Sequence, residues 1–201
     1  LSAGKGSRMF SDIPKPLHLI SGKPMIEWVI DANNSANIKK CIIVVPENCK
    51  ELEEFCHNFE TVVQKRPKGT ADAVKKATSL LKEFTCIALI CFADTPFLTP
   101  KTIEKIIKSF NNKTKLVITG FKKSEKNNYG KILFSTKNEP IEIIEQKDAE
   151  IKNIHSEFCN GGIMAIHSSM LNQLNKIQEN LISNEFYLTD LVKIFNQEKK
   201  K

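Results

Sequence analysis

The sequence predicts an α/β protein in which a doubly wound, mostly parallel (mixed) sheet lies between two layers of helices. Short apolar runs alternate with helical patterns along the 201 residues, which is the order that a sheet covered by its crossover helices requires. The runs at 41–45 and 86–92 are apolar at nearly every position, as in strands whose two faces are both covered. Ligands of such sheets bind at the carboxyl ends of the strands, so we expect a functional site there.

Each further element follows from a local pattern. Helical spacing of apolar residues predicts helices around 26–30 and 73–81, and a third that begins at Pro100, because proline is favoured in the first turn of a helix. Ser168 is the expected cap of a helix that reaches Leu181. The remaining elements are strands at 116–121 and 162–166, a hairpin that joins 130–134 to 140–146, and a last helix after Tyr187.

The composition is that of one soluble domain spanning residues 1–201. No apolar run is long enough to cross a bilayer and no signal peptide is visible, so we expect a cytoplasmic protein that binds no membrane. The net charge of +7 leaves nucleic-acid binding open as an alternative. We expect no nucleic-acid partner, because the charge comes from scattered lysines without the arginine and aromatic clusters of such surfaces.

The cysteines and histidines show no metal-binding spacing. Cys41, Cys86 and Cys91 lie in apolar runs and are expected to behave as small hydrophobic core residues. Cys159 is a candidate nucleophile beside Asn160, but no histidine is placed to activate it. Any metal ion is therefore expected on oxygen ligands.

The chain opens with a glycine-rich, basic loop, LSAGKGSRM. The loop matches neither the Walker A pattern nor the dinucleotide fingerprint, since Met9 stands where the third glycine of the latter belongs. Gly4 and Gly6 allow main-chain N–H groups to approach an anion closely, and Ser7 and Arg8 add donors. The loop therefore indicates a phosphate site, with a simple glycine turn as the alternative.

Four more residues are candidates for chemistry, each with a structural alternative. Lys15 lies between two prolines, which either frame a functional cation or make a plain turn. Asp94 follows a buried strand, where a carboxylate can hold Mg²⁺ or merely start the Thr-Pro turn. Thr70 stands at a helix start and is either a ligand contact or an N-cap. Glu145 ends a hairpin strand, where the alternative is a solvated edge carboxylate.

Taken in this order, the motifs resemble those of the sugar nucleotidyltransferase family, in particular the N-terminal pyrophosphorylase domain of the bacterial bifunctional N-acetylglucosamine-1-phosphate uridyltransferase/glucosamine-1-phosphate acetyltransferase. The resemblance covers nearly the whole chain and implies a Rossmann-like nucleotidyltransferase domain. It implies formation of UDP-N-acetylglucosamine and pyrophosphate from UTP and N-acetylglucosamine 1-phosphate with Mg²⁺, a step of cell-wall peptidoglycan and lipopolysaccharide biosynthesis. The motifs that carry it are LSAGKGSRMFSDIPKPLHLISGKPMIEWVIDA, VVQKRPKGTADAV, FADTPFL, NNYGKI, IEQKDA, CNGGIMA and EFYLTDL.

The resemblance also implies roles for individual residues. Both reactants are anions, so catalysis is expected to consist of positioning and charge neutralisation without an acid–base pair. The implied roles are nucleotide binding for Ser2, Ala3, Gly4, Gly6, Ser7, Gln64, Gly69 and Thr70, catalysis for Arg8 and Lys15, Mg²⁺ binding for Asp94, and sugar binding for Gly130, Glu145 and Asn160.

Several positions depart from the family pattern. Ser7 and Gly161 stand where threonine is usual, Pro16 where valine is common, and Lys131 where arginine is usual. The second Mg²⁺ ligand of the family, an asparagine beyond the last helix, would follow residue 201, and the hexapeptide repeats of the acetyltransferase half are absent. We therefore expect a monomer without acetyl transfer. The alternatives are another sugar- or alcohol-phosphate nucleotidyltransferase and an inactive nucleotide-binding remnant.

A loop of this kind leaves the end of a central buried strand, of which only Leu1 is present. Without that strand its two neighbours would keep unpaired main-chain groups along an open apolar slot, at about 1–3 kcal/mol per unpaired group. We therefore expect either that residues are missing at the start of the chain or that it comes from a decaying gene and has poor activity.

Overall fold

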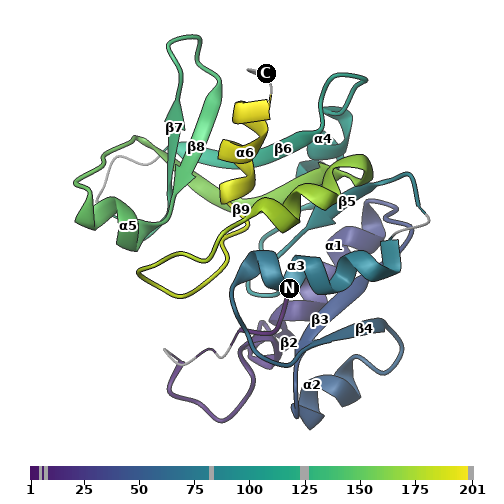
Figure 1. Cartoon of the computed structure of the whole chain (residues 1–201). Helices are drawn as coiled ribbons and strands as arrows, with labels where there is room; N and C mark the ends of the chain where they lie inside the picture. The colour runs from purple at the N-terminus through teal and green to yellow at the C-terminus, as the bar shows by residue number, and fades with distance from the viewer. Residues whose placement is uncertain (5, 7–8, 82–83, 123–126, 199–201) are drawn as a thin grey trace.

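A computed structural model describes residues 1–4, 6, 9–81, 84–122 and 127–198. Helices cover both faces of a central sheet, which gives the expected three-layer α/β/α arrangement (Figure 1). The elements in chain order are η2 (Lys15–Leu17), β1 (Leu19–Ile20), β2 (Lys23–Pro24), α1 (Met25–Ser35), β3 (Ile42–Pro46), α2 (Lys50–Phe55), β4 (Glu60–Gln64), α3 (Thr70–Ala77), η3 (Thr78–Leu81), β5 (Ile87–Ile90), α4 (Pro100–Lys108), β6 (Leu116–Lys122), β7 (Lys131–Phe134), β8 (Pro140–Ile144), α5 (Gln146–Ile151), β9 (Phe158–His167), η4 (Ser168–Lys176) and α6 (Asp190–Glu198).

The first half of the chain forms the parallel part of the sheet. β3 and β4 pair in parallel over their full lengths. Residues 1–3 lie between β3 and β5, because the Ser2 N–H donates to the Val44 carbonyl and the Ala93 N–H donates to the Leu1 carbonyl, both at 3.0 Å. This short segment therefore takes the central position of the parallel strands, beside α3 (Figure 1).

The second half of the chain adds antiparallel strands around β9. This long strand pairs with β5, β6 and β7, and β7 pairs with β8 in the expected hairpin. The expected α/β fold with a mixed sheet is thus confirmed. The expected predominance of parallel pairs is limited to the first half of the chain, because β9 runs against each strand that it contacts.

The side chains of β9 show how the sheet is covered on both sides. Ile163 and Ala165 pack in one cluster with residues of α1 and α4, whereas Met164 and Ile166 pack in another with residues of α3, η4 and α6. Successive side chains of a strand point to opposite faces, so one apolar run serves both layers. The continuous apolar character of the sequence here reflects burial from two sides.

Helix α4 begins as the sequence predicts. The Thr99 hydroxyl accepts a hydrogen bond from the Thr102 N–H, and Pro100 occupies the first helical position. Ile103 and Ile106 are buried against the sheet. Both the residues that start this helix and the apolar face that it buries are therefore those that the sequence predicts.

The helix expected from Ser168 to Leu181 is wrong in type and in length. Residues 168–176 form the 3₁₀ helix η4, whose N-cap is His167, and Leu181 is 95% exposed beyond its end. The Ser168 hydroxyl is not a cap, because it accepts the Cys86 N–H at 3.1 Å and so connects the start of η4 with the start of β5. The Ser168 side chain makes this long-range hydrogen bond in place of the expected capping bond.

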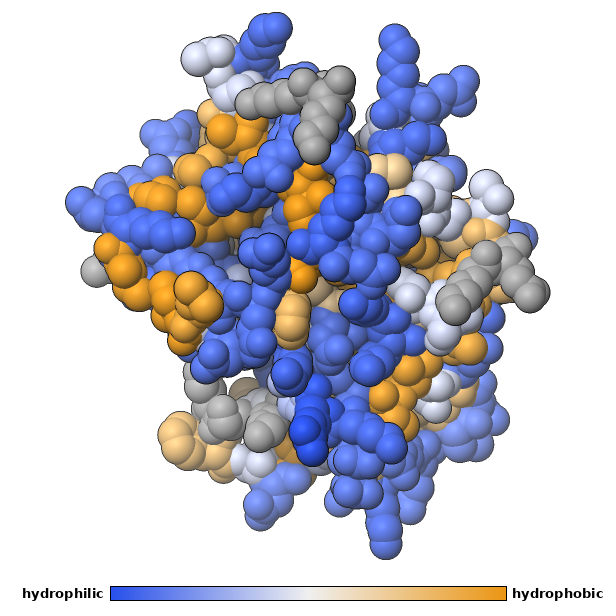
Figure 2. Space-filling model, viewed as in Figure 1, coloured by the Kyte–Doolittle hydropathy of each residue, from blue (hydrophilic) through white to orange (hydrophobic). Residues whose placement is uncertain are grey.

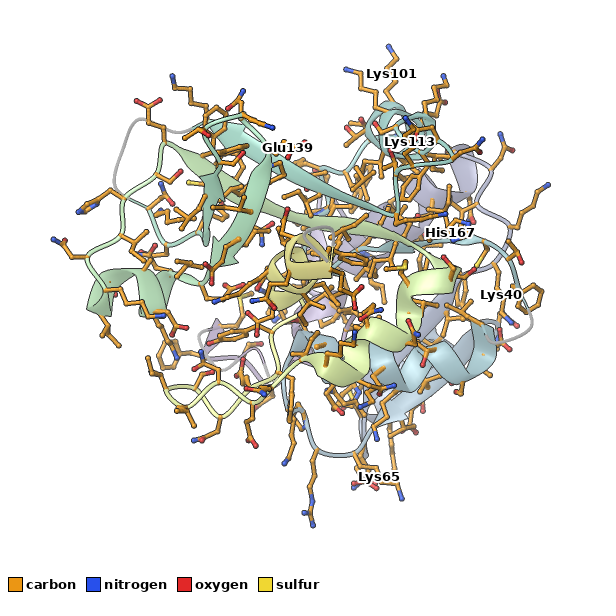
Figure 3. The ribbon with its side chains drawn as sticks, turned by 45° about the horizontal axis from the view of Figure 1, so that its top comes forward. Lys40, Lys65, Lys101, Lys113, Glu139 and His167 are labelled. Atoms are coloured by element: carbon orange, nitrogen blue, oxygen red, sulfur yellow. The ribbon has the colours of Figure 1, made fainter. Side chains whose placement is uncertain are left out.

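The surface carries the charge in a dispersed form. The face in Figure 2 is mainly hydrophilic, with hydrophobic side chains in separate groups. The labelled lysines lie at separate parts of the molecule: Lys101 and Lys113 at the top, Lys40 at the right and Lys65 at the bottom (Figure 3). Among the described residues no helix is both long and apolar enough to cross a membrane.

Candidate active site

A cavity of about 570 Å³ opens where residues 1–3, β4 and β5 end. This is the carboxyl edge of the parallel strands, where a doubly wound sheet binds its ligand. The expected Ser7 and Arg8 lie outside the described residues. The other residues expected on the nucleotide, its phosphates and the metal line this cavity together: Ser2, Ala3, Gly4, Gly6, Lys15, Gln64, Gly69, Thr70 and Asp94.

The start of the glycine-rich loop is anchored to the sheet and then leaves it. Ser2 is buried, and its hydroxyl donates to the Val44 carbonyl at 2.7 Å, so this hydroxyl holds the strand in place. Gly4 follows with nothing within 4 Å of an added Cβ. Gly6 has a φ of +59°, and a Cβ there would lie 2.9 Å from the Cβ of Lys15. Glycine at position 6 therefore permits both the left-handed backbone and the close approach to Lys15.

Lys15 and Asp94 form an ion pair at the wall of the cavity. Their side chains are 34% and 37% exposed, so both charges are accessible. An exposed pair contributes only about 0.2–1 kcal/mol, so a phosphate and a cation can replace the two partners at small cost. Asp94 also stands in the turn after β5, so its structural and its chemical interpretation are compatible.

Asp94 fits a magnesium site that is open to substrate and to water. Mg²⁺ is usually held by one or two carboxylates together with substrate phosphates and water. Within the described ranges, no group of three or more His, Cys, Asp or Glu side chains gathers as a metal cluster. A single accessible carboxylate at the wall of a cavity of about 570 Å³, which is large enough for a nucleotide, suits an ion that takes most of its ligands from the substrate.

The side-chain amide of Gln64 is held in one orientation. Gln64 is the last residue of β4 and is only 2% exposed. Its Nε2 donates to the Gly69 carbonyl at 3.2 Å and to Asp72 Oδ2 at 2.6 Å. A carboxylate accepts only, so Asp72 fixes the amide with its nitrogen toward α3. The Gln64 side-chain oxygen is the acceptor left for a ligand.

The start of α3 is joined to the segment that precedes α6. Gly69, not Thr70, is the N-cap of α3, and its φ of +98° is a conformation for glycine. A Cβ on Gly69 would lie 2.5 Å from the Phe186 carbonyl oxygen. The Thr70 hydroxyl accepts the Leu188 N–H at 3.0 Å. The Thr70 side chain therefore connects the start of α3 with the segment before α6. It is not the N-cap of α3, which the sequence left open as an alternative.

The residues expected on the sugar form a second cluster, outside the lining of the 570 Å³ cavity. The Asn160 N–H donates to the Gly130 carbonyl at 2.8 Å, and a Cβ on Gly130 would lie 3.5 Å from Glu145 Oε2. Glu145 accepts the Thr189 hydroxyl at 2.9 Å. Glu185 lines the cavity, and its charge also acts on Glu145, so the segment before α6 connects the cavity with the cluster.

Carboxyl groups gather at this second cluster. Burial raises the pKa of Glu145, although the hydrogen bond from Thr189 opposes this, and burial raises the pKa of Asp190 to about 6. Asp148 is buried beside them and accepts from the Asn180 side-chain amide at 2.7 Å. Carboxylates accept hydrogen bonds from hydroxyl groups, so the cluster suits a polyhydroxylated ligand. Glu145 is a half-buried carboxyl group that accepts a hydrogen bond from Thr189, and not the solvated edge residue of the alternative interpretation.

Two departures from the family pattern have structural counterparts nearby. A Cβ on Gly161 would lie 2.6 Å from Thr119 Oγ1, and this hydroxyl donates to the Ile163 carbonyl at 2.9 Å, so Thr119 fills the space beside Gly161. Lys131 is 9% exposed and donates to Asn127 Oδ1 at 2.9 Å. No sequence pattern marks Asp72, Thr119 and Glu185 as site residues, because each matters only through the contact that its side chain makes in the folded chain.

Comparison with known proteins places the chain in one family. Residues 1–180 match the family described as the MobA-like NTP transferase domain. The chain is 33% identical over 204 residues to the bifunctional protein GlmU of Ruegeria sp. (strain TM1040), a match over 98% of this chain and 45% of that protein. It is 36% identical over 202 residues to the bifunctional protein GlmU of Buchnera aphidicola subsp. Acyrthosiphon pisum (strain Tuc7), over 98% of this chain and 43% of that protein. The chain thus spans less than half the length of these relatives.

Solved structures share the fold. A crystal structure of UDP-glucose pyrophosphorylase complexed with UDP-glucose superposes with a TM-score of 0.74 at 19% identity, over 100% of this chain and 85% of that chain. The apo form of a UDP-glucose pyrophosphorylase gives a TM-score of 0.77 at 20% identity, with the same coverage. These structures have the α/β fold of nucleotidyltransferases, as the sequence predicts.

Proposed function

The chain belongs to the family of MobA-like NTP transferase domains, and from this membership we propose that it transfers uridylate from UTP to N-acetylglucosamine 1-phosphate. The products are UDP-N-acetylglucosamine and pyrophosphate. One observation carries the proposal: an accessible cation, an accessible carboxylate and an oriented glutamine, Lys15, Asp94 and Gln64, line one cavity at the carboxyl edge of the parallel strands. GlmU relatives and the sugar nucleotidyltransferase fold support a sugar-phosphate nucleotidyltransferase.

The reaction is an in-line displacement at phosphorus. A phosphate oxygen of the sugar phosphate forms a bond to the α-phosphorus of UTP, and the bond from that phosphorus to the bridging oxygen breaks, so pyrophosphate leaves with its electron pair. Lys15 leaves Asp94 and neutralises phosphate charge, which lowers the repulsion between two anionic reactants. Mg²⁺ held at Asp94 supplies charge neutralisation and orientation of the phosphates when bound. The glycine loop provides main-chain N–H groups close to the same phosphates.

Base selection follows from the orientation of Gln64. Both hydrogens of its side-chain amide are used by Gly69 and Asp72, so the side-chain oxygen presents an acceptor. Uracil has a ring N–H at the edge where cytosine has an acceptor nitrogen. A site built to accept from one base leaves its oxygen unpaired with the other, which gives discrimination. We expect uracil to be preferred over cytosine for this reason.

Sugar recognition is assigned to the second cluster. The Asn160 N–H of β9 donates to the Gly130 carbonyl just before β7, and the side chain of Glu145, the N-cap of α5, lies beside Gly130. A hydrogen bond to a charged group contributes about 1.5–3 kcal/mol, so the Glu145 carboxylate is the strongest acceptor for sugar hydroxyls among these three residues. We propose that the sugar lies over this cluster, with its phosphate directed toward the cavity and Glu185 between them.

A substrate panel tests the proposed function. Pyrophosphate release is measured with UTP, CTP, GTP and dTTP against N-acetylglucosamine 1-phosphate, and with UTP against glucose 1-phosphate and alcohol phosphates. The proposal predicts turnover with UTP and N-acetylglucosamine 1-phosphate at the highest kcat/KM. A higher kcat/KM with another phosphate would assign the chain to another nucleotidyltransferase reaction. UTP binding without pyrophosphate release from any pair would indicate a non-catalytic remnant.

A further inference from the structure

The segment that leads into α6 is fixed to the start of α3. The Phe186 N–H donates to the Lys68 carbonyl at 2.8 Å, and the Leu188 N–H donates to the Thr70 hydroxyl at 3.0 Å. Leu188 and Thr189 are buried, with 3% and 7% of their surfaces exposed. The segment passes between α3 and α5 (Figure 1). Thr189 is therefore held in place by the main-chain contacts of its neighbours.

The hydroxyl of Thr189 is directed across to Glu145. Its Oγ1 donates to Glu145 Oε1 at 2.9 Å, between residues that are 44 positions apart in the chain. A hydroxyl has a single hydrogen, so this bond uses the whole donor capacity of the side chain. Thr189 therefore cannot donate to a ligand while it holds Glu145, and any effect on a ligand passes through the carboxylate.

The other oxygen of Glu145 is left for a ligand. Oε2 lies 3.5 Å from the position of a Cβ on Gly130, and no group within the described ranges donates a hydrogen bond to it. The two oxygens of a carboxylate are fixed relative to each other, so a bond to Oε1 restricts the direction of Oε2. The side chain thus presents one oriented acceptor beside Gly130, as the recognition of a sugar hydroxyl requires.

The Thr189 hydroxyl also favours the ionised form of Glu145. Burial raises the pKa of Glu145, and the hydrogen bond from Thr189 lowers it. Lys193 is paired with Glu142, and Lys131 donates to other partners, so neither ammonium neutralises this carboxylate. The other titratable groups around it carry no positive charge: Asp148 of α5, Glu185 and Tyr187 of the segment before α6, and Asp190 at the start of α6.

We propose that Thr189 is a positioning residue of the sugar site, which holds one carboxylate oxygen of Glu145 so that the other accepts a sugar hydroxyl beside Gly130. This role rests on the proposed function, because it concerns the sugar phosphate of that reaction. Thr189 does not contact the substrate itself. Its loss is therefore expected to weaken the binding of the sugar phosphate, while the binding of UTP and the displacement at phosphorus continue.

Thr189→Val tests this role, because valine keeps the shape of the side chain and removes the hydroxyl. We expect the KM for N-acetylglucosamine 1-phosphate to rise at least about tenfold, with kcat and the KM for UTP within about twofold of the parent values. Thr189→Ser keeps the hydroxyl and should restore the parent KM. The matched control is Thr78→Val at the far end of α3, which removes a hydroxyl bonded to the Lys75 carbonyl at 2.7 Å and should change neither KM.

Two further measurements separate positioning from a general structural effect. In a Glu145→Ala background, Thr189→Val should raise the KM for the sugar phosphate no further, because no carboxylate remains to be positioned. Carbon NMR titration of the Glu145 carboxyl group, assigned by its loss in Glu145→Ala, should give a higher pKa in Thr189→Val than in the parent and in Thr189→Ser. The titration uses the free protein, so the phosphate of the substrate does not contribute.

The variants can each overturn the role of Thr189. An unchanged KM for the sugar phosphate in Thr189→Val would do so, as would equal rises in both KM values, a further rise in the Glu145→Ala background, or an unchanged pKa of Glu145. Failure of the proposed function shows instead in the parent chain, as no release of pyrophosphate from this pair of substrates. The sugar site and the role of Thr189 in it would then fall together.

Discussion

Replacement of Gly69 by alanine is expected to loosen the junction between α3 and the segment before α6. Gly69 has φ +98° and ψ 178°, a region that is essentially restricted to glycine. A Cβ there would lie 2.5 Å from the carbonyl oxygen of Phe186 and 2.8 Å from its nitrogen. Both are main-chain atoms, so no flexible side chain can move aside.

The size of the effect follows from strain and from hydrogen bonds. Backbone strain of this kind costs about 1–3 kcal/mol for a residue other than glycine. Displacement of Phe186 also weakens its bond to the Lys68 carbonyl, at 2.8 Å, and the bond that its own carbonyl accepts from the Ala71 N–H, at 2.9 Å. Each such bond contributes about 0.5–1.5 kcal/mol. We expect Gly69→Ala to lower the free energy of unfolding by about 2–4 kcal/mol in urea denaturation.

Gly22→Ala separates strain from the clash. Gly22 has φ +79°, and an added Cβ there would meet no atom within 4 Å, so this variant carries only the conformational cost. We expect it to lose about 1 kcal/mol. The KM for UTP should rise in Gly69→Ala, since Gly69 lines the cavity, and should not change in Gly22→Ala. If both variants unfolded at the same urea concentration, the clash with Phe186 would contribute nothing to the loss of stability in Gly69→Ala.

The remaining predictions concern the base, a half-buried acid and a strand contact. Asp72→Asn is expected to allow the Gln64 side-chain amide to rotate, because the acceptor that fixes its orientation is lost. The ratio of kcat/KM for UTP to kcat/KM for CTP should therefore fall. An unchanged ratio would show that Asp72 does not orient Gln64. Asp190 has a folded pKa raised to about 6 by burial, so its ionisation destabilises the fold as pH rises from about 4 to above 6. Asp190→Asn should therefore be more stable than the parent chain at pH 8, with the difference vanishing near pH 3 in urea titrations; a constant difference would contradict this. Gly161→Ala is expected to lower the free energy of unfolding, because the added methyl group meets Thr119 Oγ1. In a Thr119→Ala background the same substitution should cost less stability. Additive losses of stability in the double variant would refute the contact.

The sequence predicts those parts of the site that depend on local chemistry and chain order. The glycine loop, the carboxylate after an apolar strand and the position at the carboxyl edge all follow from the alternation of strands and helices.

The rest depends on contacts between distant segments. The ion pair of Lys15 with Asp94 spans 79 residues, and the hydrogen bond from the Leu188 N–H to the Thr70 hydroxyl spans 118. Thr119 lies beside Gly161 only because the pairing of β6 with β9 shifts register between Ile118 and Gly120. Strand register is set by the whole sheet, so no local pattern identifies such neighbours.

We propose that the phosphates of UTP and of the sugar phosphate react in the cavity lined by Lys15 and Asp94. The most direct measurement is the rate of pyrophosphate release from UTP and N-acetylglucosamine 1-phosphate with Mg²⁺, in Asp94→Asn and in the control Asp12→Asn, an exposed aspartate that does not line the cavity. We expect at least a hundredfold loss for Asp94→Asn with an unchanged urea midpoint, and the parent rate for Asp12→Asn. Equal rates in the two variants would show that the reaction, or the metal, lies elsewhere.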